Sequence, residues 1–171
     1  PTASTTMQLA YGDSLAIAAM KYKKFDKMDF KKLHPAGSLG AQLKTVEDIM
    51  IKGNQIPFVN ENLKMNKALK ILTEKKLGIL IIRDKNRKTK GIITDGQVRR
   101  FSEKNTNFQS LTVRKIMTKK PVTIEKNELA VKALSLMNNK KITSLLVKNK
   151  KKPLLTIGVV HIHTLLRANI A

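Results

Sequence analysis

His34 is the side chain whose type and surroundings best suit proton transfer. An imidazole titrates near neutral pH, so it can accept and donate a proton within one catalytic cycle. The sequence that follows, Pro35-Ala36-Gly37-Ser38-Leu39-Gly40, predicts a turn that would hold His34 at the edge of a domain. A lone histidine after an apolar residue is more simply a structural or exposed side chain. The residues alone therefore favour a structural His34 and leave catalysis as the alternative.

A second group of polar residues suits the binding of an anion. His161 and His163 stand near the end of an apolar run, and Arg99, Arg100 and Arg167 fall within predicted helices. Such side chains bind phosphate or carboxylate groups well. The alternative is that the histidines are ordinary strand-end residues and the arginines a solvated surface. Two histidines at this spacing lack a third ligand for a metal, so we expect no metal site and no cofactor.

The N-terminal segment supplies hydroxyl groups for either helix capping or phosphate binding. Ser4, Thr5 and Thr6 precede a run of small and apolar residues, which predicts a helix over residues 5–24. As N-cap residues these hydroxyls need no further function; as ligands, Ser4 and Thr5 would bind a substrate phosphate. The apolar face of this helix is wide, so we expect it to pack inside a larger domain. A further helix is predicted to begin at 26–29.

One pattern that occurs twice, about 67 residues apart, must position the remaining candidates. The first copy comprises Val46–Met50, Ala68-Leu69, Leu77–Ile82 and Gly91–Asp95, and the second comprises Val113–Met117, Ala133-Leu134, Ile142–Val147 and Gly158–Ile162. Each copy predicts a lead that ends in Met, a short strand, a helix, two strands and a final helix. A repeat of this kind implies two copies of one unit, each with an apolar face that it cannot bury alone.

The predicted elements are helices over 66–76 and 128–140 and two strand pairs. Residues 77–83 pair with 91–94, and residues 142–147 pair with 155–160, each across a polar, Lys-rich turn. These strands are apolar on both faces. We therefore expect helices to cover one face of each sheet and the partner repeat to cover the other.

Composition limits the classes of function. The formal net charge is +22, but only six of the 34 basic residues are Arg and aromatic residues make up 4%. Sequence-specific readers of nucleic acid use Arg and exposed aromatic side chains, so we expect only nonspecific, salt-sensitive contact with nucleic acid. The chain has no Cys, no signal-peptide pattern and no apolar run long enough to span a membrane. We expect a soluble cytoplasmic protein, and Pro1 suggests a piece of a longer one.

The ordered repeat, with the strand-to-helix turn Gly91-Ile92-Ile93-Thr94-Asp95-Gly96, resembles the paired cystathionine β-synthase (CBS) domain. This resemblance implies an α+β fold, a tandem CBS pair of two β-α-β-β-α repeats related by a pseudo-twofold axis. The expected divisions are a hinge and helical remnant over 1–44, repeat 1 over 45–106 and repeat 2 over 107–171.

The N-terminal segment narrows the resemblance. Its sequences at 1–6, 9–16 and 34–40 are similar to the end of a sugar isomerase (SIS) domain, and with a CBS pair they resemble the arabinose 5-phosphate isomerase family (the KpsF/GutQ type). That family interconverts D-ribulose 5-phosphate and D-arabinose 5-phosphate in the synthesis of Kdo, a sugar of lipopolysaccharide and capsule. Most of its active site would lie outside this chain, which we therefore expect to be inactive alone.

The resemblance also assigns residues. His34 matches the histidine of the family's His-Pro-Gly-Gly motif, although Ala36 replaces a glycine, and becomes the candidate catalytic residue. The CBS ligand signature falls on Gly91, Thr94 and Gln97 in repeat 1 and on Gly158, His161 and Thr164 in repeat 2. With Asp95, His163, Arg99, Arg100 and Arg167, these form the predicted ligand-binding set.

Neither copy keeps the acidic residue that usually ends the CBS signature. Loss of a charge-assisted hydrogen bond costs roughly 1.5–3 kcal/mol, so tight AMP or ATP binding in the usual geometry is not expected. The predicted partners are the sugar phosphate substrate in the intact enzyme, a nucleotide or CMP-Kdo effector at the clefts, and further copies of the chain. The family implies a dimer through the CBS pair and a tetramer of the intact enzyme. The alternative function is a CBS protein that binds an anionic nucleotide or nucleic acid.

Overall fold

The computed structural model describes residues 2–26, 29–30, 33, 37–104 and 106–170. It divides into two compact units, residues 1–43 and Lys44–Ala171. The candidate catalytic residue His34 lies outside the described residues.

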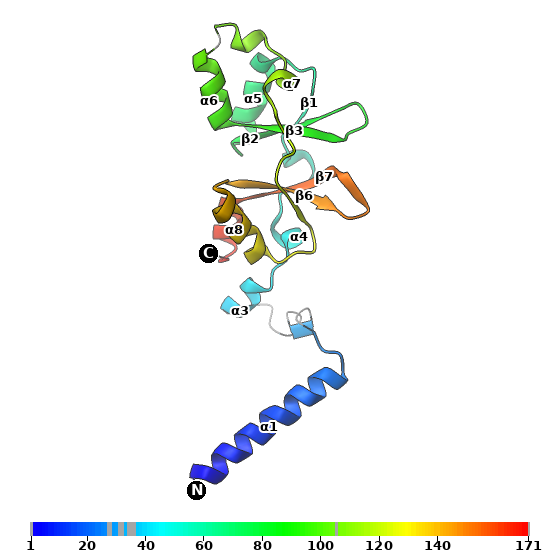
Figure 1. The fold of residues 1–171 in the computed structure, drawn as a ribbon, viewed down its shortest axis with the longest axis vertical. Coiled ribbons are helices and arrows are strands. Elements are labelled where there is room, and N and C mark those ends of the chain that lie inside the picture. The colour runs from blue at the N-terminus through cyan, green and yellow to red at the C-terminus, as the bar shows by residue number, and fades with distance from the viewer. Residues whose placement is uncertain (1, 27–28, 31–32, 34–36, 105, 171) are drawn as a thin grey trace. The chain divides into compact units, whose positions relative to one another are not determined.

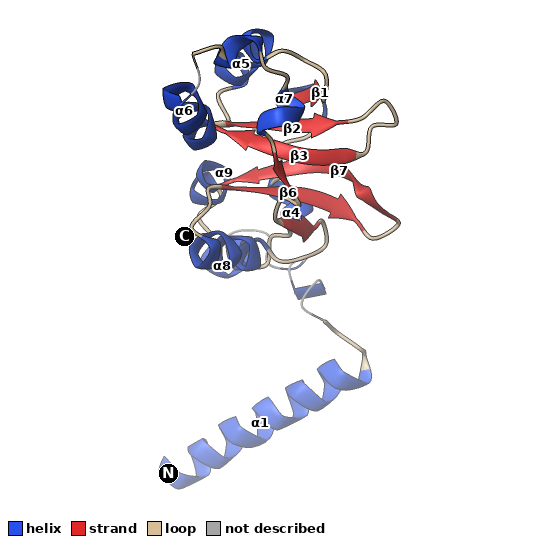
Figure 2. Ribbon diagram, turned by 45° about the horizontal axis from the view of Figure 1, so that its top comes forward, coloured by secondary structure: helices blue, strands red, loops and turns tan. Residues whose placement is uncertain are grey.

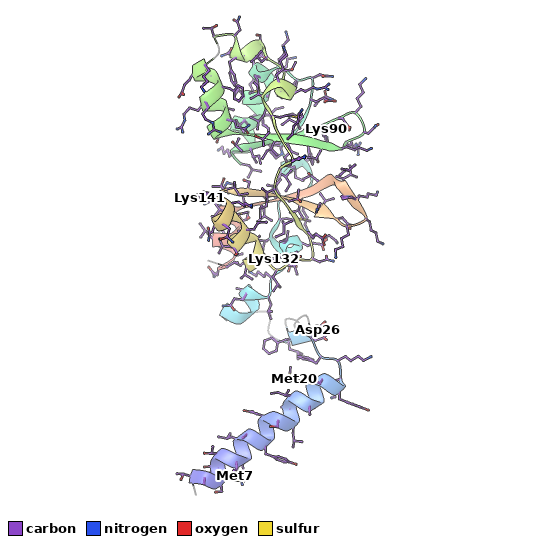
Figure 3. The ribbon with its side chains drawn as sticks, viewed as in Figure 1. Met7, Met20, Asp26, Lys90, Lys132 and Lys141 are labelled. Carbon is purple, nitrogen blue, oxygen red and sulfur yellow. The ribbon has the colours of Figure 1, made fainter. Side chains whose placement is uncertain are left out.

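The first unit contains α1 (Thr2–Tyr22) and the short helix α3 (Gly37–Gln42). The helix predicted over 5–24 is present, but it begins at Thr2, so Ser4, Thr5 and Thr6 lie inside its first turns and the prediction that they cap it was wrong. None of the residues of α1 is buried. Figure 3 labels Met7 and Met20, whose side chains extend from this helix and are 72% and 43% exposed. At 26–29 the backbone N–H groups of Asp26 and Asp29 donate to each other's carboxylates, at 3.2 and 3.0 Å. This reciprocal arrangement is typical of a helix start, as the sequence predicted there.

Repeat 1 of the second unit follows the predicted order. After its lead come β1 (Phe58–Asn60), α5 (Met65–Lys75), β2 (Ile79–Arg83), β3 (Thr89–Thr94) and α6 (Asp95–Lys104), as Figure 1 shows. β2 pairs with β1 in parallel and with β3 in antiparallel fashion. The predicted helix and strand pair are therefore confirmed, and the parallel pairing is an addition.

Repeat 2 reproduces the same arrangement. It contains β5 (Thr123–Glu125), α8 (Ala130–Lys140), β6 (Ser144–Asn149), β7 (Lys152–His161) and α9 (Ile162–Arg167). β6 pairs in parallel with β5 and in antiparallel fashion with β7. Two matching hydrogen bonds establish the equivalence of the repeats at the helix starts: Asp95 N–H donates to Gly78 O, and Ile162 N–H donates to Thr143 O.

The two sheets face each other, and the helices cover their outer faces. Figure 2 shows the strands in the centre, with α5 and α6 outside one sheet and α8 outside the other. A shared apolar seam lies between the sheets and contains Ile56, Ile79, Ile81, Leu146 and Val159, all buried. A separate core fills the space under the helices of each repeat. The prediction that each sheet is covered by helices on one face and by the other repeat on the other is therefore confirmed.

Each repeat is completed by the short segment that begins the other repeat and contains Met50 or Met117, which we call its lead. The lead of repeat 1 contains α4 (Val46–Ile49), and its Val46 is buried in the core of repeat 2. The lead of repeat 2 contains α7 (Val113–Ile116) and β4 (Thr118–Lys119), and its Val113 is buried in the core of repeat 1. Among the described residues of this unit, the remaining elements are the 3-10 turns η1 (Gly53–Gln55) and η2 (Phe108–Ser110).

The exchange rests on matched backbone hydrogen bonds. Val46 N–H donates to Glu128 O and Glu47 N–H donates to Lys126 O, at 2.8 and 2.9 Å. At the equivalent places Val113 N–H donates to Leu63 O and Arg114 N–H donates to Glu61 O, at 2.9 and 3.2 Å. Because each lead carries buried apolar side chains and satisfied backbone groups into the opposite repeat, the two repeats form one folded body.

Candidate ligand-binding site

A cavity of about 510 Å³ opens where the two repeats meet. Its walls come from the start of β2, the turn from β3 into α6, the segment between β4 and β5, and the start of β6. The predicted site residues that line it are Thr94, Asp95, Gln97, Arg100 and His161. A volume of this size is in the range of sites for small organic ligands, roughly 300–1,000 Å³.

The carboxylate of Asp95 lies against Gly78 at the repeat 1 wall. Gly78 has a φ of +61°, and a Cβ built on it would come 2.9 Å from Asp95 Oδ2. A side chain here would be strained by the backbone and would displace the carboxylate, so glycine is required for both reasons. Asp95 is the first residue of α6, where a negative charge is favourable beside the helix N-terminus.

Three cations lie at the rim of the cavity: Arg100, Lys120 and Lys141. All three are exposed, and none of them takes part in an ion pair with another described residue. Lys120 adopts a left-handed φ of 56° in the segment between β4 and β5, although glycine or asparagine fits such a backbone better. Lys141 has a φ of 53° and caps the C-terminus of α8.

Gln97 is buried and satisfied by protein groups. Its Nε2 donates to Thr118 Oγ1 at 2.6 Å and lies 3.4 Å from Ile116 O, and its Oε1 accepts from Thr94 N–H at 3.1 Å. These bonds tie the start of α6 to β4. The amide therefore holds the wall of the cavity together, and its polar atoms already have partners before any ligand arrives.

His161 combines a place in the cavity with the N-cap of α9. Its Nδ1 accepts from His163 N–H at 3.2 Å, and the two imidazole rings lie 5.0 Å apart. Thr164 completes the cap, because its hydroxyl accepts from His161 N–H at 3.3 Å, and it also donates to His161 O at 2.6 Å. Burial and then the neighbouring His163 lower the pKa of His161 below its ordinary value. His161 is therefore neutral at pH 7, and a neutral ring is what the cap requires.

Gly91 and Gly158 lie in strands at places where another segment of the chain passes close by. A Cβ on Gly91 would lie 2.5 Å from Thr118 O, and a Cβ on Gly158 would collide with the side chain of Met50. Each glycine thus lets the lead of the opposite repeat pass close to a strand. Neither lines the cavity.

The structure places the other predicted residues away from the cavity lining. Arg99, His163 and Arg167 are exposed, and Thr164 is engaged in the α9 cap. In α1, Thr5 Oγ1 donates to Thr2 O at 2.9 Å, and Ser4 lies in the same helical turn.

Sequence reasoning missed several residues of the cavity, above all Lys120 and Lys141. They belong to the 28 Lys that remain when the six Arg are subtracted from the 34 basic residues, so residue type alone did not distinguish them. Their position gave no usable signal either, because Lys76 also directly precedes an apolar residue and does not line the cavity.

Neither a metal site nor a membrane span emerges from the described part of the chain. No three His, Asp or Glu side chains among the described residues gather closely enough to hold a metal ion. No described helix has both the length and the apolar character needed to cross a membrane.

The exchanged leads and the facing sheets define a tandem pair of α+β repeats with a cavity between them. The CBS domain family matches residues 46–104 and 113–171. The chain therefore belongs to the CBS domain family.

Similar proteins of known name extend the comparison. The chain is 41% identical over 171 residues to arabinose 5-phosphate isomerase KdsD of Salmonella typhi, a match that covers 99% of this chain and 51% of that protein. It thus spans about half the length of the curated relatives that it matches.

Solved structures support the fold. The CBS domain pair of MJ0100, in complex with 5′-methylthioadenosine and S-adenosyl-L-methionine, has a TM-score of 0.64 at 24% identity and covers 72% of this chain and 94% of its own. CBSX2 in complex with AMP has a TM-score of 0.62 at 23% identity, with the same coverage of 72% and 94%.

Proposed function

We propose that this chain is the C-terminal regulatory and oligomerising part of a D-arabinose 5-phosphate isomerase. The observation that carries the proposal is the 41% identity to one such isomerase, which continues across 99% of the chain and so includes residues before the CBS pair. A CBS pair that merely shared the fold would match over 46–171 alone. The exposed apolar side chains of α1 are also what a helix from a larger domain would present.

The isomerisation itself would need residues beyond this chain. In the proposal, His34 serves the intact enzyme as an acid–base group, and Ser4 and Thr5 lie near the substrate phosphate. The chain alone is then expected to show no turnover of D-ribulose 5-phosphate. The CBS pair would contribute regulation and assembly, with a dimer formed through the pair and a tetramer in the intact enzyme.

The regulatory part of the proposal places an anionic nucleotide or nucleotide sugar in the cavity between the repeats. Three rim cations without ion-pair partners among the described residues would attract it. The two solved CBS structures hold adenine nucleosides or nucleotides, which makes this ligand class reasonable to test first.

The test is an isomerase assay of the full-length gene product, with and without AMP or CMP-Kdo. We expect the nucleotide to change the rate, and we expect the Lys120→Gln/Lys141→Gln double variant to lose that response relative to its own rate without nucleotide. Lys119→Gln, which changes the same charge at a neighbouring exposed position, should keep the response. Turnover by the chain alone, or an unchanged response in the double variant, would contradict the proposal.

A further inference from the structure

The hairpin turns of the two repeats are densely basic. Residues 84–90 include the turn from β2 into β3, and residues 148–152 include the turn from β6 into β7. Eight of these 12 residues are Lys or Arg, against 34 of 171 in the whole chain. Because Asp84 is the one acidic residue in either segment, their eight positive charges leave a net charge of +7. We call the two segments together the basic hairpin edge.

The two segments lie side by side at one end of the strands. Both turns project from the same side of the CBS pair (Figure 1, Figure 2). Their bases are joined by Thr89 and Thr156, whose hydroxyl oxygens are 2.8 Å apart, and Thr156 N–H donates to Thr89 Oγ1 at 3.3 Å. The cavity described above opens beside Thr94 and His161, at the opposite ends of the same strands. The basic hairpin edge is therefore a surface of its own.

Most of its charge is not neutralised by the protein. Asp84 lies 3.1 Å from Lys90, and Glu125 of β5 lies 3.5 Å from Lys150. The other six cations form no ion pair with another described residue: Lys85, Arg87, Lys88, Lys148, Lys151 and Lys152. All of these except Lys148 are exposed. The edge therefore presents a broad positive surface to whatever lies outside it.

An apolar side chain stands within this charge. Leu154 is 56% exposed and directly follows the second basic segment and Pro153. It lines a hollow of about 180 Å³ together with Lys120 and Lys148, so cations lie beside it. Among the described residues of the CBS pair, the other large apolar side chain that is exposed is Leu166 on α9.

The fold does not require this leucine, because the second turn is longer than the first. Five residues separate Arg83 from its strand partner Thr89, whereas seven separate Lys148 from its partner Thr156. Leu154 is one of the seven, and the shorter turn of repeat 1 contains no apolar residue. Since repeat 1 folds without such a side chain, packing within the pair does not account for it.

We infer that the basic hairpin edge binds reversibly to the surface of an anionic lipid bilayer, with Leu154 entering the interface. Clusters of about four to eight Lys or Arg are attracted to anionic headgroups. A leucine among lysines can leave water at that interface while the ammonium groups stay at the level of the headgroups. The inference goes beyond the proposed function and involves no ligand in the cavity.

Other occupants of the edge fit the observations less well. A second copy of the chain would bring the same charge of +22 and be repelled. Nucleic acid would match the charge, but it would leave Leu154 in water. Neither basic segment has an aromatic side chain on which an unpaired base could stack.

Co-sedimentation of the whole chain with vesicles tests the inference. We expect binding to vesicles of phosphatidylglycerol and phosphatidylcholine at about 0.1 M salt, and no binding to phosphatidylcholine alone. Each lysine near an anionic bilayer strengthens binding about fivefold. Lys85→Gln/Lys88→Gln/Lys151→Gln/Lys152→Gln should therefore weaken vesicle binding by about tenfold or more. Leu154→Ser removes the inserted apolar surface and should weaken it about threefold.

Two matched controls separate the edge from the rest of the surface. Lys64→Gln/Lys67→Gln/Lys70→Gln/Lys76→Gln removes the same charge from exposed positions on and beside α5. Because distant exposed charges are screened over a Debye length of about 10 Å, this variant should bind within about twofold of the parent. Leu166→Ser removes the exposed leucine on α9 and should bind like the parent.

A parallel titration with duplex DNA separates lipid from nucleic acid. The quadruple variant at the edge should weaken both interactions, whereas Leu154→Ser should weaken only vesicle binding. Vesicle binding by Leu154→Ser equal to that of the parent would assign the edge to polyanions in general and overturn the inference. It would also be overturned if the α5 variant lost as much binding as the edge variant, or if the parent failed to bind anionic vesicles. Each of these results would leave the proposed isomerase regulation unaffected, because none involves the cavity.

Discussion

At the scale of single residues, the most consequential side chain is His161, because one imidazole serves both the cavity and a helix cap. Its Nδ1 accepts the His163 N–H only when the ring is neutral. Protonation would remove that acceptor and place a positive charge at the start of α9, where the helix dipole is unfavourable to cations. The buried Leu165 on the same helix links the cap to the core of repeat 2.

This coupling predicts a loss of stability on acidification. The pKa of His161 is lowered in the folded state relative to the ordinary value of 6.5, so the unfolded chain binds more protons below that pH. The contribution is complete above about pH 6.5 and is lost as the pH falls toward the folded-state pKa. We expect the melting temperature of the parent to decrease between pH 7.5 and pH 5.5, as measured by circular dichroism.

His161→Asn provides the matched control for that measurement. An asparagine can accept the cap hydrogen bond and does not titrate, so the pH-dependent decrease should be smaller in this variant. An equal decrease in parent and variant would assign the acid sensitivity to other groups.

At the scale of elements, each lead forms an ion pair with the repeat that receives it, and the charges are reversed between the two pairs. The first lead supplies the acidic partner, and the second lead supplies the basic partner. Lys126 Nζ of repeat 2 lies 2.8 Å from Glu47 Oε2 on the first lead. At the equivalent place, Arg114 Nη1 on the second lead lies 3.8 Å from Glu61 Oε2 of repeat 1. If each lead docked on its own repeat, Glu47 would face Glu61 and Arg114 would face Lys126. The charges thus oppose that alternative pairing and favour the exchange.

A charge reversal tests this role. Lys126→Glu should lower the free energy of unfolding by about 0.5–1 kcal/mol, because it places two carboxylates together at a partly exposed site. Glu47→Lys in the same chain should restore most of the loss, as measured by urea denaturation. Lys119→Glu makes the same charge change at an exposed residue with no ion pair in the described structure. Should the double variant be no more stable than Lys126→Glu alone, the pair would have no part in fastening the lead.

The elements themselves were largely predictable from the sequence, whereas their exchange was not. Apolar spacing located α5 and α8, and Lys-rich turns located both strand pairs, because these signals act over a few residues. A lead such as 46–50 carries the same apolar residues whichever repeat receives it. The choice depends on contacts across the pair, so no local pattern reveals it.

The candidate site was predictable only in part for a related reason. Thr94 and His161 end strands that the pattern located and Asp95 follows one, so the sequence indicated them. Lys120 and Lys141 enter the cavity because a left-handed backbone turns the chain there, and neither position carries the usual glycine. Among the 28 Lys, the two that line the cavity can be identified only when the repeats are packed together.

At the scale of the whole molecule, neither repeat has a complete core of its own. Residues 45–106 lack the buried Val113 and Ile116, and residues 107–171 lack the buried Val46. We expect each fragment, produced separately, to show no cooperative unfolding transition. An equimolar mixture should regain one, detectable by near-ultraviolet circular dichroism. A cooperative transition in either fragment alone would show that the exchanged lead is dispensable.

The exchanged leads also determine where the polypeptide enters the CBS pair. Ala130 N–H donates to Lys44 O, and Lys44 Nζ donates to Ala168 O, so the chain enters the pair on the repeat that comes second in sequence. A displacement of α8 or α9 would be transmitted to the preceding backbone without crossing the seam. A displacement of repeat 1 would reach that backbone only through repeat 2. Repeat 2 is therefore the direct mechanical link between the CBS pair and the residues before Lys44.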